Sequence, residues 1–251
     1  MSLNKFKKEM HKLRDGKKAK LLSGFFKTGK GQYGEGDIFL GIMVPKQREA
    51  AANHKDLSLN DLQILLNSRI HEYRLTALFI LLHKYQKADK EEKRKIAGFY
   101  LKNTKNINNW DLVDLSAPNI LGEYLLDQKI QKDFRVLGNA KHFRHKDRKI
   151  LYKLSRGHLW EKRIAVLATF AFIRKNKFKD ALNIAETLLK DRHDLIHKAV
   201  GWMLREIGKR NQQIEEKFLA RHCRAMPRTM LRYAIEKFPE KKRKFYLNCK
   251  A

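Results

Sequence analysis

The chain has 251 residues, of which 43% are hydrophobic, and its 56 Lys and Arg against 27 Asp and Glu give a net charge of +29 at pH 7. This hydrophobic share excludes a disordered basic tail, because it is enough to bury a core. The excess of cations indicates a polyanionic partner, nucleic acid first and an anionic membrane surface second. The cations gather in residues 1–30, 129–163 and 221–251.

The N-terminal region lacks the apolar segment of a signal peptide, and it leads into a glycine-rich stretch at residues 27–37. Gly29, Gly31 and Gly34 match a formal G-x-G-x-x-G pattern. A dinucleotide-binding fingerprint requires a strand before this pattern, whereas a helix is expected here, and the Walker A sequence is absent. We therefore expect a loop, either a plain linker or a mobile segment that touches DNA phosphates, and nucleotide binding is disfavoured.

Most of the remaining chain follows a helical pattern in which apolar residues recur with the spacing i, i+3, i+4 and i+7. Four such stripes are Leu75, Leu78, Phe79 and Leu82; Ile164, Leu167, Ala168 and Ala171; Val200, Met203, Leu204 and Ile207; and Leu231, Ala234, Ile235 and Phe238. The last three begin 36 and 31 residues apart, a period typical of an α-solenoid of stacked helix pairs. We predict an all-α solenoid forming a single domain over residues 1–251, with a concave basic groove. An irregular helical bundle is the alternative.

The segment Asn109–Asp114 combines an aromatic side chain with carboxylates. On a helix Trp110 and Asp114 are i, i+4 neighbours, while Leu112 and Leu115 point toward the core. A carboxylate repels phosphate, so its presence in a phosphate-binding groove suggests a charge that develops during a reaction. The alternative is that Asp114 pairs with a nearby arginine, and that Asp111 does likewise or caps a helix.

Trp160 and Arg163 open a later helix. Trp160 falls on the same face as Ile164 and Ala168, so a core position is expected. Arg163 lies at the edge of that stripe, where its guanidinium is expected to reach a phosphate or to pair with Asp114.

Trp202 points away from the stripe that begins at Val200. It shares its face with Lys198, Arg205 and Lys209. A large apolar ring among cations loses favourable hydration unless it is covered, and nucleic acid is flat, stackable and negatively charged. This helix face is therefore expected to line the basic groove.

The sequence gives no sign of a metal site or of a membrane segment. Cys223 and Cys249 lack the spacing of a disulfide framework or a zinc knuckle, and His71-Glu72 is not followed by the second histidine of a zincin. No stretch is long and uncharged enough to span a membrane. We expect a cytoplasmic protein that needs no metal and no cofactor and binds no membrane.

Four groups of residues occur in an order that is specific to one family. They are Leu40-Gly41-Ile42 followed by Pro45 and Arg48; Trp110-Asp111 with Val113-Asp114; Trp160 with Arg163; and Lys198-Ala199 with Gly201-Trp202 and Leu204-Arg205-Glu206. In these residues the chain resembles the AlkD-type DNA alkylation repair proteins, which are DNA glycosylases built from HEAT-like repeats. The resemblance covers most of the chain. It departs at Asn109, where some relatives have another aromatic residue, and in the glycine-rich stretch.

The resemblance implies a monofunctional glycosylase that acts, as a monomer without a cofactor, on duplex DNA containing cationic N3- or N7-alkylated purines. Trp110 and Trp202 would contact the deoxyribose at the lesion, and Asp114 would stabilise the positively charged sugar and position the attacking water. Arg163 would hold a nearby phosphate. The cations expected to bind the DNA backbone with it are Lys162, Lys198, Arg205 and Lys209.

Two other functions remain open from the sequence. A non-catalytic protein that binds DNA or another structured nucleic acid explains the charge and the tryptophans but gives Asp114 no role. A solenoid scaffold for acidic proteins explains the charge but not Trp110 and Trp202.

Overall fold

The computed structural model describes residues 2–127 and 148–249, and the chain divides into two compact units, residues 1–116 and 117–251. The described residues form helices and turns, with a single isolated parallel bridge between Ile38 and Ile70 and no strand. The all-α prediction is confirmed. The basic stretch predicted at residues 129–163 lies, up to residue 147, outside the described residues.

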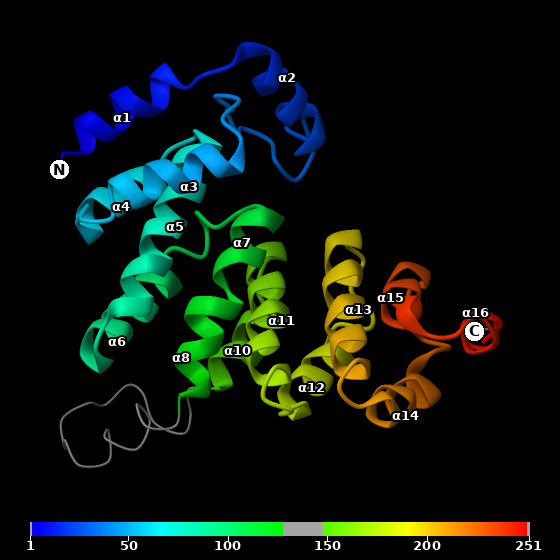
Figure 1. Ribbon diagram of the computed structural model, residues 1–251. Coiled ribbons are helices and arrows are strands. Elements are labelled where there is room, and N and C mark those ends of the chain that lie inside the picture. The colour runs from blue at the N-terminus through cyan, green and yellow to red at the C-terminus, as the bar shows by residue number, and fades with distance from the viewer. Residues whose placement is uncertain (1, 128–147, 250–251) are drawn as a thin grey trace. The chain divides into compact units, whose positions relative to one another are not determined.

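The first unit is organised around its longest helix, α5 (Figure 1). Its helices are α1 (Leu3–Lys12), α2 (Gly16–Phe25), α3 (Val44–Asn53), α4 (Leu59–Leu66), α5 (His71–Lys87), α6 (Lys90–Lys102) and α7 (Trp110–Ser116). Helix α5 packs against α3, α4, α6 and α7, and it is buried along most of its length. In the predicted stripe Leu75, Leu78 and Phe79 are buried, whereas Leu82 at the end is half-buried.

The glycine-rich stretch at residues 27–37 folds as a series of turns. The Gly31 amide donates to the Glu35 carboxylate at 2.8 Å, and the Arg69 guanidinium donates to the Gly36 carbonyl at 3.0 Å. A Cβ atom on Gly34 would lie 2.4 Å from the Phe26 carbonyl oxygen, so only glycine fits this close approach. The stretch is therefore a loop, as predicted, and it lies against the end of α2.

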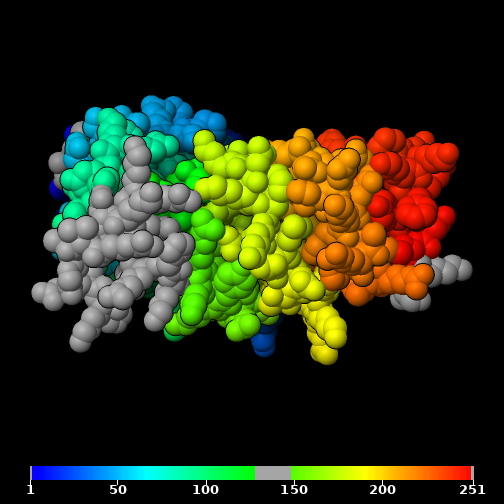
Figure 2. Space-filling view, turned by 90° about the horizontal axis from the view of Figure 1, so that it is seen from below, coloured from blue at the N-terminus to red at the C-terminus, as the bar shows by residue number. Residues whose placement is uncertain are grey.

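The second unit is a stack of helix pairs. It contains the π-helical turn η1 (Pro118–Gly122), α8 (Glu123–Leu126), α10 (Lys149–Leu154), α11 (Leu159–Ile173), α12 (Lys179–Thr187), α13 (Asp194–Gly208), α14 (Gln212–His222), α15 (Arg228–Ala234), the 3-10 turn η2 (Ile235–Lys237) and α16 (Glu240–Leu247). Helix α13 packs between α11 and α15, while α12 contacts α11 and α14 contacts α13. In Figure 2 the colours of this unit follow one another from green to red, so successive helix pairs stack in chain order.

The three predicted stripes of this unit form its core. Every residue of the stripes that begin at Ile164, Val200 and Leu231 is buried. Trp160 is also in the core, as its place on the Ile164 face predicted, with 7% of its surface exposed. The stacked pairs agree with a solenoid-like fold. That residues 1–251 form a single domain with a concave basic groove stays a prediction.

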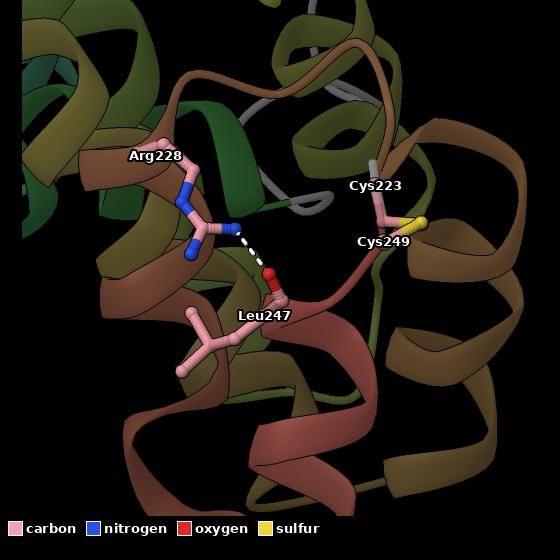
Figure 3. Close-up of a disulfide and its surroundings, with 4 residues drawn as sticks. All are labelled: Cys223, Arg228, Leu247 and Cys249. Atoms are coloured by element: carbon pink, nitrogen blue, oxygen red, sulfur yellow. Dashed lines mark hydrogen bonds between the residues drawn. A yellow bond between two sulfur atoms is a disulfide. The ribbon is translucent and has the colours of Figure 1, made fainter. Parts of the chain in front are cut away.

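A disulfide joins Cys223, just after α14, to Cys249, just after α16 (Figure 3). Near it the Arg228 guanidinium donates to the Leu247 carbonyl at 2.6 Å. The spacing of these cysteines did not indicate a disulfide, because they are 26 residues apart in sequence and only the fold brings the two helix ends together. Disulfides are uncommon in cytosolic proteins, so the compartment expected from the sequence stays a prediction.

Among the described residues, no helix is long and apolar enough to cross a membrane.

Gly201 allows α13 to approach α15 closely. A Cβ atom there would lie 2.4 Å from the Met230 carbonyl oxygen and 2.5 Å from the Tyr233 Cβ atom. We expect Gly201→Ala to lower the free energy of unfolding by about 2 kcal/mol, because two helix backbones must move apart. Urea unfolding followed by circular dichroism measures this change.

Gly98→Ala is the matched control. Gly98 is also in the interior of a helix, but a Cβ atom there meets nothing within 4 Å. This substitution is expected to be neutral or to stabilise by up to about 1 kcal/mol through helix propensity. Equal losses in both variants would contradict the close packing of α13 on α15.

Candidate functional site

Helix α7 carries the predicted pair Trp110 and Asp114 in the first unit. The Trp110 amide donates to the Asn109 side chain at 2.8 Å, and this polar contact marks the start of the helix. Leu112 is buried in the core as predicted, and Leu115 is half-buried. Trp110 and Asp114 are both half-buried, so each shows part of its side chain at the surface, one helical turn apart.

Trp110 is the outer member of a stack of four rings. Its ring stacks on Phe26 with centroids 5.2 Å apart, and Phe26 stacks on Phe39 at 5.1 Å. Phe39 stacks on the His71 imidazole at 4.6 Å, and Phe26 also contacts this imidazole directly at 4.9 Å. Phe25 meets Trp110 edge-on at 5.9 Å and is 60% exposed. The orientation of Trp110 is therefore set by rings from the end of α2, the following loop and the start of α5.

His71, at the inner end of this stack, lies between two carboxylates. Its Nδ1 atom is 3.2 Å from Asp37 Oδ2, and its Nε2 atom is 2.8 Å from Asp111 Oδ2. Arg74 donates to the same Asp37 oxygen at 2.6 Å. The side chains of His71, Arg74 and Asp37 are almost fully buried. The network thus links α5, the end of the glycine-rich loop and the first turn of α7.

Both bonded carboxylates favour the charged form of His71. Burial lowers its pKa, but the negative charge of Asp111 and the hydrogen bonds to Asp111 and Asp37 outweigh this and raise the pKa to about 9. Burial raises the pKa of Asp37, yet the hydrogen bonds and positive charges of His71 and Arg74 lower it below its usual range. At neutral pH His71 is therefore an imidazolium that donates from both ring nitrogens.

Glu72, the next residue of α5, explains the sequence Leu40-Gly41-Ile42. Its fully buried carboxylate accepts hydrogen bonds from the amides of Leu40, Gly41 and Ile42 at 3.0, 2.8 and 3.2 Å. Gly41 has a φ of 85°, and a Cβ atom there would lie 2.1 Å from the Asp15 carbonyl oxygen. This motif therefore fixes the backbone that leads from the ring stack into α3.

Asp114 lies close to the buried hydroxyl of Tyr100. Burial raises the pKa of Tyr100, the hydrogen bond to Ser116 opposes this change, and the negative charge of Asp114 raises the pKa further. Tyr100 is hydrogen-bonded to Ser116 Oγ at 3.0 Å. Asp114 thus stands at the boundary between the core of the first unit and its surface.

In the second unit Trp202 is half-buried on α13, while the neighbouring stripe is fully buried. The prediction that it lies off the core face is confirmed. Its Nε1 atom donates to Glu206 Oε1 at 3.2 Å, and its ring centroid is 6.0 Å from that of Phe170. The Arg174 guanidinium covers the Phe170 ring at 4.9 Å.

The cations predicted to bind DNA all have acidic or carbonyl partners within this unit. Lys198 pairs with Asp194 at 2.6 Å, Lys209 with Glu206 at 2.6 Å, Lys162 with Asp191 at 2.7 Å, and Arg205 with Glu236. Arg163 is 5% exposed and donates to the Leu195 carbonyl at 2.6 Å. The charge of this face is therefore partly balanced inside the protein.

Sequence reasoning did not select Phe25, Phe26, Phe39 or His71 as part of the site. The adjacent phenylalanines and the His71-Glu72 pair at a helix start are visible in the sequence, but only the folded chain brings them to Trp110. Among the described residues, no three His, Cys, Asp or Glu side chains are placed to hold a metal ion.

The model of the family described as DNA alkylation repair enzyme matches residues 6–238. The chain belongs to this family. A solved structure from Enterococcus faecalis, described as a predicted DNA alkylation repair enzyme, is similar with a TM-score of 0.66 and 16% identity, over 90% of this chain and 97% of that one. That likeness shows the fold. None of the curated proteins matches the chain.

The family assignment supports a role in DNA repair with DNA as the substrate. The alkylation repair part of the sequence-based interpretation is thereby confirmed. The glycosylase reaction and the roles of individual residues are finer than the family description, and they stay predictions.

The raised pKa of His71 makes the stability of the first unit depend on pH. A group whose pKa is higher in the folded state stabilises fully below its unfolded pKa of 6.5, and this contribution is lost as the pH rises through about 9. The difference corresponds to roughly 3 kcal/mol. We expect the free energy of unfolding to fall between pH 6.5 and 9.

His71→Gln tests this prediction, because glutamine keeps a hydrogen-bonding side chain but does not titrate. The variant is expected to be less stable at pH 6.5 and to approach the wild type at pH 9, measured by urea unfolding at each pH. A parallel decline in both proteins would show that other groups cause it.

Proposed function

We propose that this member of the family is a monofunctional DNA glycosylase. It hydrolyses the N-glycosidic bond of cationic N3- or N7-alkylated purines in duplex DNA. In this proposal Asp114 stabilises the positive charge that develops on the sugar and positions the attacking water. Trp110 and Trp202 contact the deoxyribose, and the protein acts as a monomer without a cofactor.

The pairing of Trp110 with Asp114 on α7 is the observation that carries the proposal. An alkylated purine already bears a positive charge and is a good leaving group, so the reaction needs no strong general acid. It needs stabilisation of an oxocarbenium-like sugar, which a carboxylate beside an aromatic face provides. In this chain of net charge +29, a partly exposed carboxylate beside a tryptophan weakens phosphate binding. Stabilisation of the sugar cation would give this carboxylate a function that outweighs that cost.

The ring stack behind Trp110 supports the same role. A side chain that must touch a sugar while its neighbour stabilises charge has to be held in one orientation before DNA arrives. Phe26 holds the Trp110 face, and the exposed Phe25 extends the apolar surface beside it. Phe25 is the last residue of α2 and Phe26 follows it, and the first half of this helix is rich in lysine, whose charge favours a DNA backbone.

We infer that the cations of the second unit bind DNA by exchanging their carboxylate partners for phosphates. Lys198, Arg205, Lys209 and Lys162 are held by carboxylates in the free protein, and phosphates replace those carboxylates in the proposal. The phosphate contact of Arg163 and the concave basic groove are part of the same proposal. The groove and these contacts depend on how DNA lies against each unit.

The decisive substitution is Asp114→Asn. We expect it to reduce the release of N7-methylguanine and N3-methyladenine from duplex DNA to the spontaneous rate. DNA affinity is expected to be unchanged or slightly higher, because one negative charge leaves the surface. Free base is measured by chromatography, and binding by fluorescence anisotropy on an undamaged duplex.

Glu49→Gln is the control, because it removes an exposed carboxylate from the same unit, one that pairs with Lys46. It is expected to retain full excision. If the wild type releases no base but binds duplex DNA tightly and with strong salt dependence, the protein is the non-catalytic DNA-binding alternative.

Glu206→Gln tests the exchange of partners at Trp202. Glu206 accepts from Trp202 and pairs with Lys209, and Arg210 lies 3.8 Å away. Glutamine keeps an acceptor for the indole but frees the two cations. We expect tighter duplex binding. The slope of log K against the logarithm of the salt concentration is expected to become steeper by roughly one to two.

The control for this prediction is Glu216→Gln on α14, which frees Lys242 in the same unit without touching Trp202. A similar gain in both variants would mean that net charge alone, rather than the face of Trp202, governs affinity.

A further inference from the structure

The first unit contains a pocket that the proposed reaction does not use. It has a volume of about 460 Å³ and lies between the start of α4, the end of α5 and the first half of α6. Four lysines and a histidine line it, and these are Lys55, Lys84, Lys87, Lys95 and His83.

This pocket is remote from Trp110. His83 is twelve residues beyond His71 on the continuous helix α5, which corresponds to about 18 Å along its axis. The ring stack and the His71 network are at the other end of that helix. The pocket is therefore a separate feature of the first unit.

The lysines around the pocket differ from those around Trp202. Within the described residues, none of the four has a carboxylate within ion-pair distance, whereas Lys198, Lys209 and Lys162 are all paired. Two carboxylates, Asp56 and Glu92, also line the pocket, so its charge is positive by two with His83 neutral.

The surplus of positive charge affects the pKa of His83. Burial lowers its pKa, the positive charges of Lys87, Lys55 and Lys84 lower it further, and Asp56 opposes them. Like charges gathered around a concave surface repel one another in the free protein. An anion that enters the pocket relieves this repulsion.

The size and walls of the pocket indicate the class of anion. Its volume lies in the range of pockets that hold small organic ligands, and lysine binds phosphate as a compact point charge. The four lysines come from the turn before α4 and from helices α5 and α6, and this spread suits several phosphates better than one. Leu59, Ala88 and Ile96 complete the lining with apolar surface.

We propose that this pocket is a second binding site, which takes a ligand with two or more linked phosphates. The phosphates belong either to a free oligophosphate or to consecutive nucleotides of a DNA backbone. The proposal does not depend on the glycosylase reaction, because no residue of the pocket belongs to the Trp110 and Asp114 pair.

The first measurement is the NMR titration of His83 with tripolyphosphate as the probe, with His83→Gln used to assign the signal. Bound phosphates are expected to raise the pKa of His83, because they neutralise the lysines that lower it. A pKa that does not move at saturating probe would overturn the proposal.

The second measurement is affinity by calorimetry. Lys84→Ala combined with Lys87→Ala is expected to weaken tripolyphosphate binding at least about tenfold, and Glu92→Gln is expected to strengthen it. Lys8→Ala combined with Lys5→Ala is the matched control, because it removes the same charge from the exposed side of α1 and is expected to leave binding unchanged. Equal weakening in both double variants would show a diffuse effect of net charge and overturn the site.

An undamaged DNA duplex distinguishes the two sources of phosphate. If DNA supplies it, tripolyphosphate competes with the duplex and the Lys84, Lys87 double variant loses duplex affinity. If a free oligophosphate is the ligand, the duplex binds equally well to the variant and the probe binds beside it. Both results support the proposed phosphate-binding site in the pocket. Each is independent of whether Asp114 is needed for base excision.

Discussion

The buried imidazolium of His71 is the interaction on which the candidate site of the first unit depends. It joins three segments that are distant in sequence, because Asp37 ends the glycine-rich loop, His71 begins α5 and Asp111 is in the first turn of α7. A buried charge with two carboxylate partners is costly to disrupt, since removing one partner leaves an unpaired charge in the interior. The same ring supports the Phe39, Phe26 and Trp110 stack. One side chain therefore fixes both the backbone of α7 and the orientation of its tryptophan.

Charge is used in two different ways in this strongly basic protein. Around Trp202 the cations are held by carboxylates, which keeps them ordered and limits repulsion before a ligand binds. Around the pocket at the end of α5 the lysines have no such partners within the described part of the chain, and burial together with their positive charges lowers the pKa of His83. The first arrangement favours exchange with a long polyanion along a surface, whereas the second favours a compact anion in a fixed place.

The helical architecture was predictable from the sequence because its signal is local and periodic. The stripes at Ile164, Val200 and Leu231 repeat the spacing of a buried helix face, and all of them are buried. Trp202 was correctly separated from its stripe by the same geometry. The order of the quoted motifs also led to the family that the comparison with known families shows.

The contacts that shape the site were not predictable, because they join residues far apart in the chain. Periodicity places Trp110 on α7, but it says nothing of Phe26, which is more than eighty residues earlier. Likewise, the cationic face of α13 was visible, but its partner Glu236 comes from a later turn. The pairing of Cys223 with Cys249 was missed for the same reason. The periodicity of a sequence predicts which face of a helix a residue occupies, whereas the tertiary fold determines which residues contact that face.

The position of Asp114 relative to the His71 network has a consequence for the proposed chemistry. His71 is hydrogen-bonded to Asp37 and Asp111, so its positive charge is directed into the interior rather than toward Asp114. By binding Asp111, the network fixes the first turn of α7, and Asp114 follows Trp110 by one helical turn. The two aspartates of this short helix thus have separate tasks, one structural and one, in the proposed reaction, catalytic.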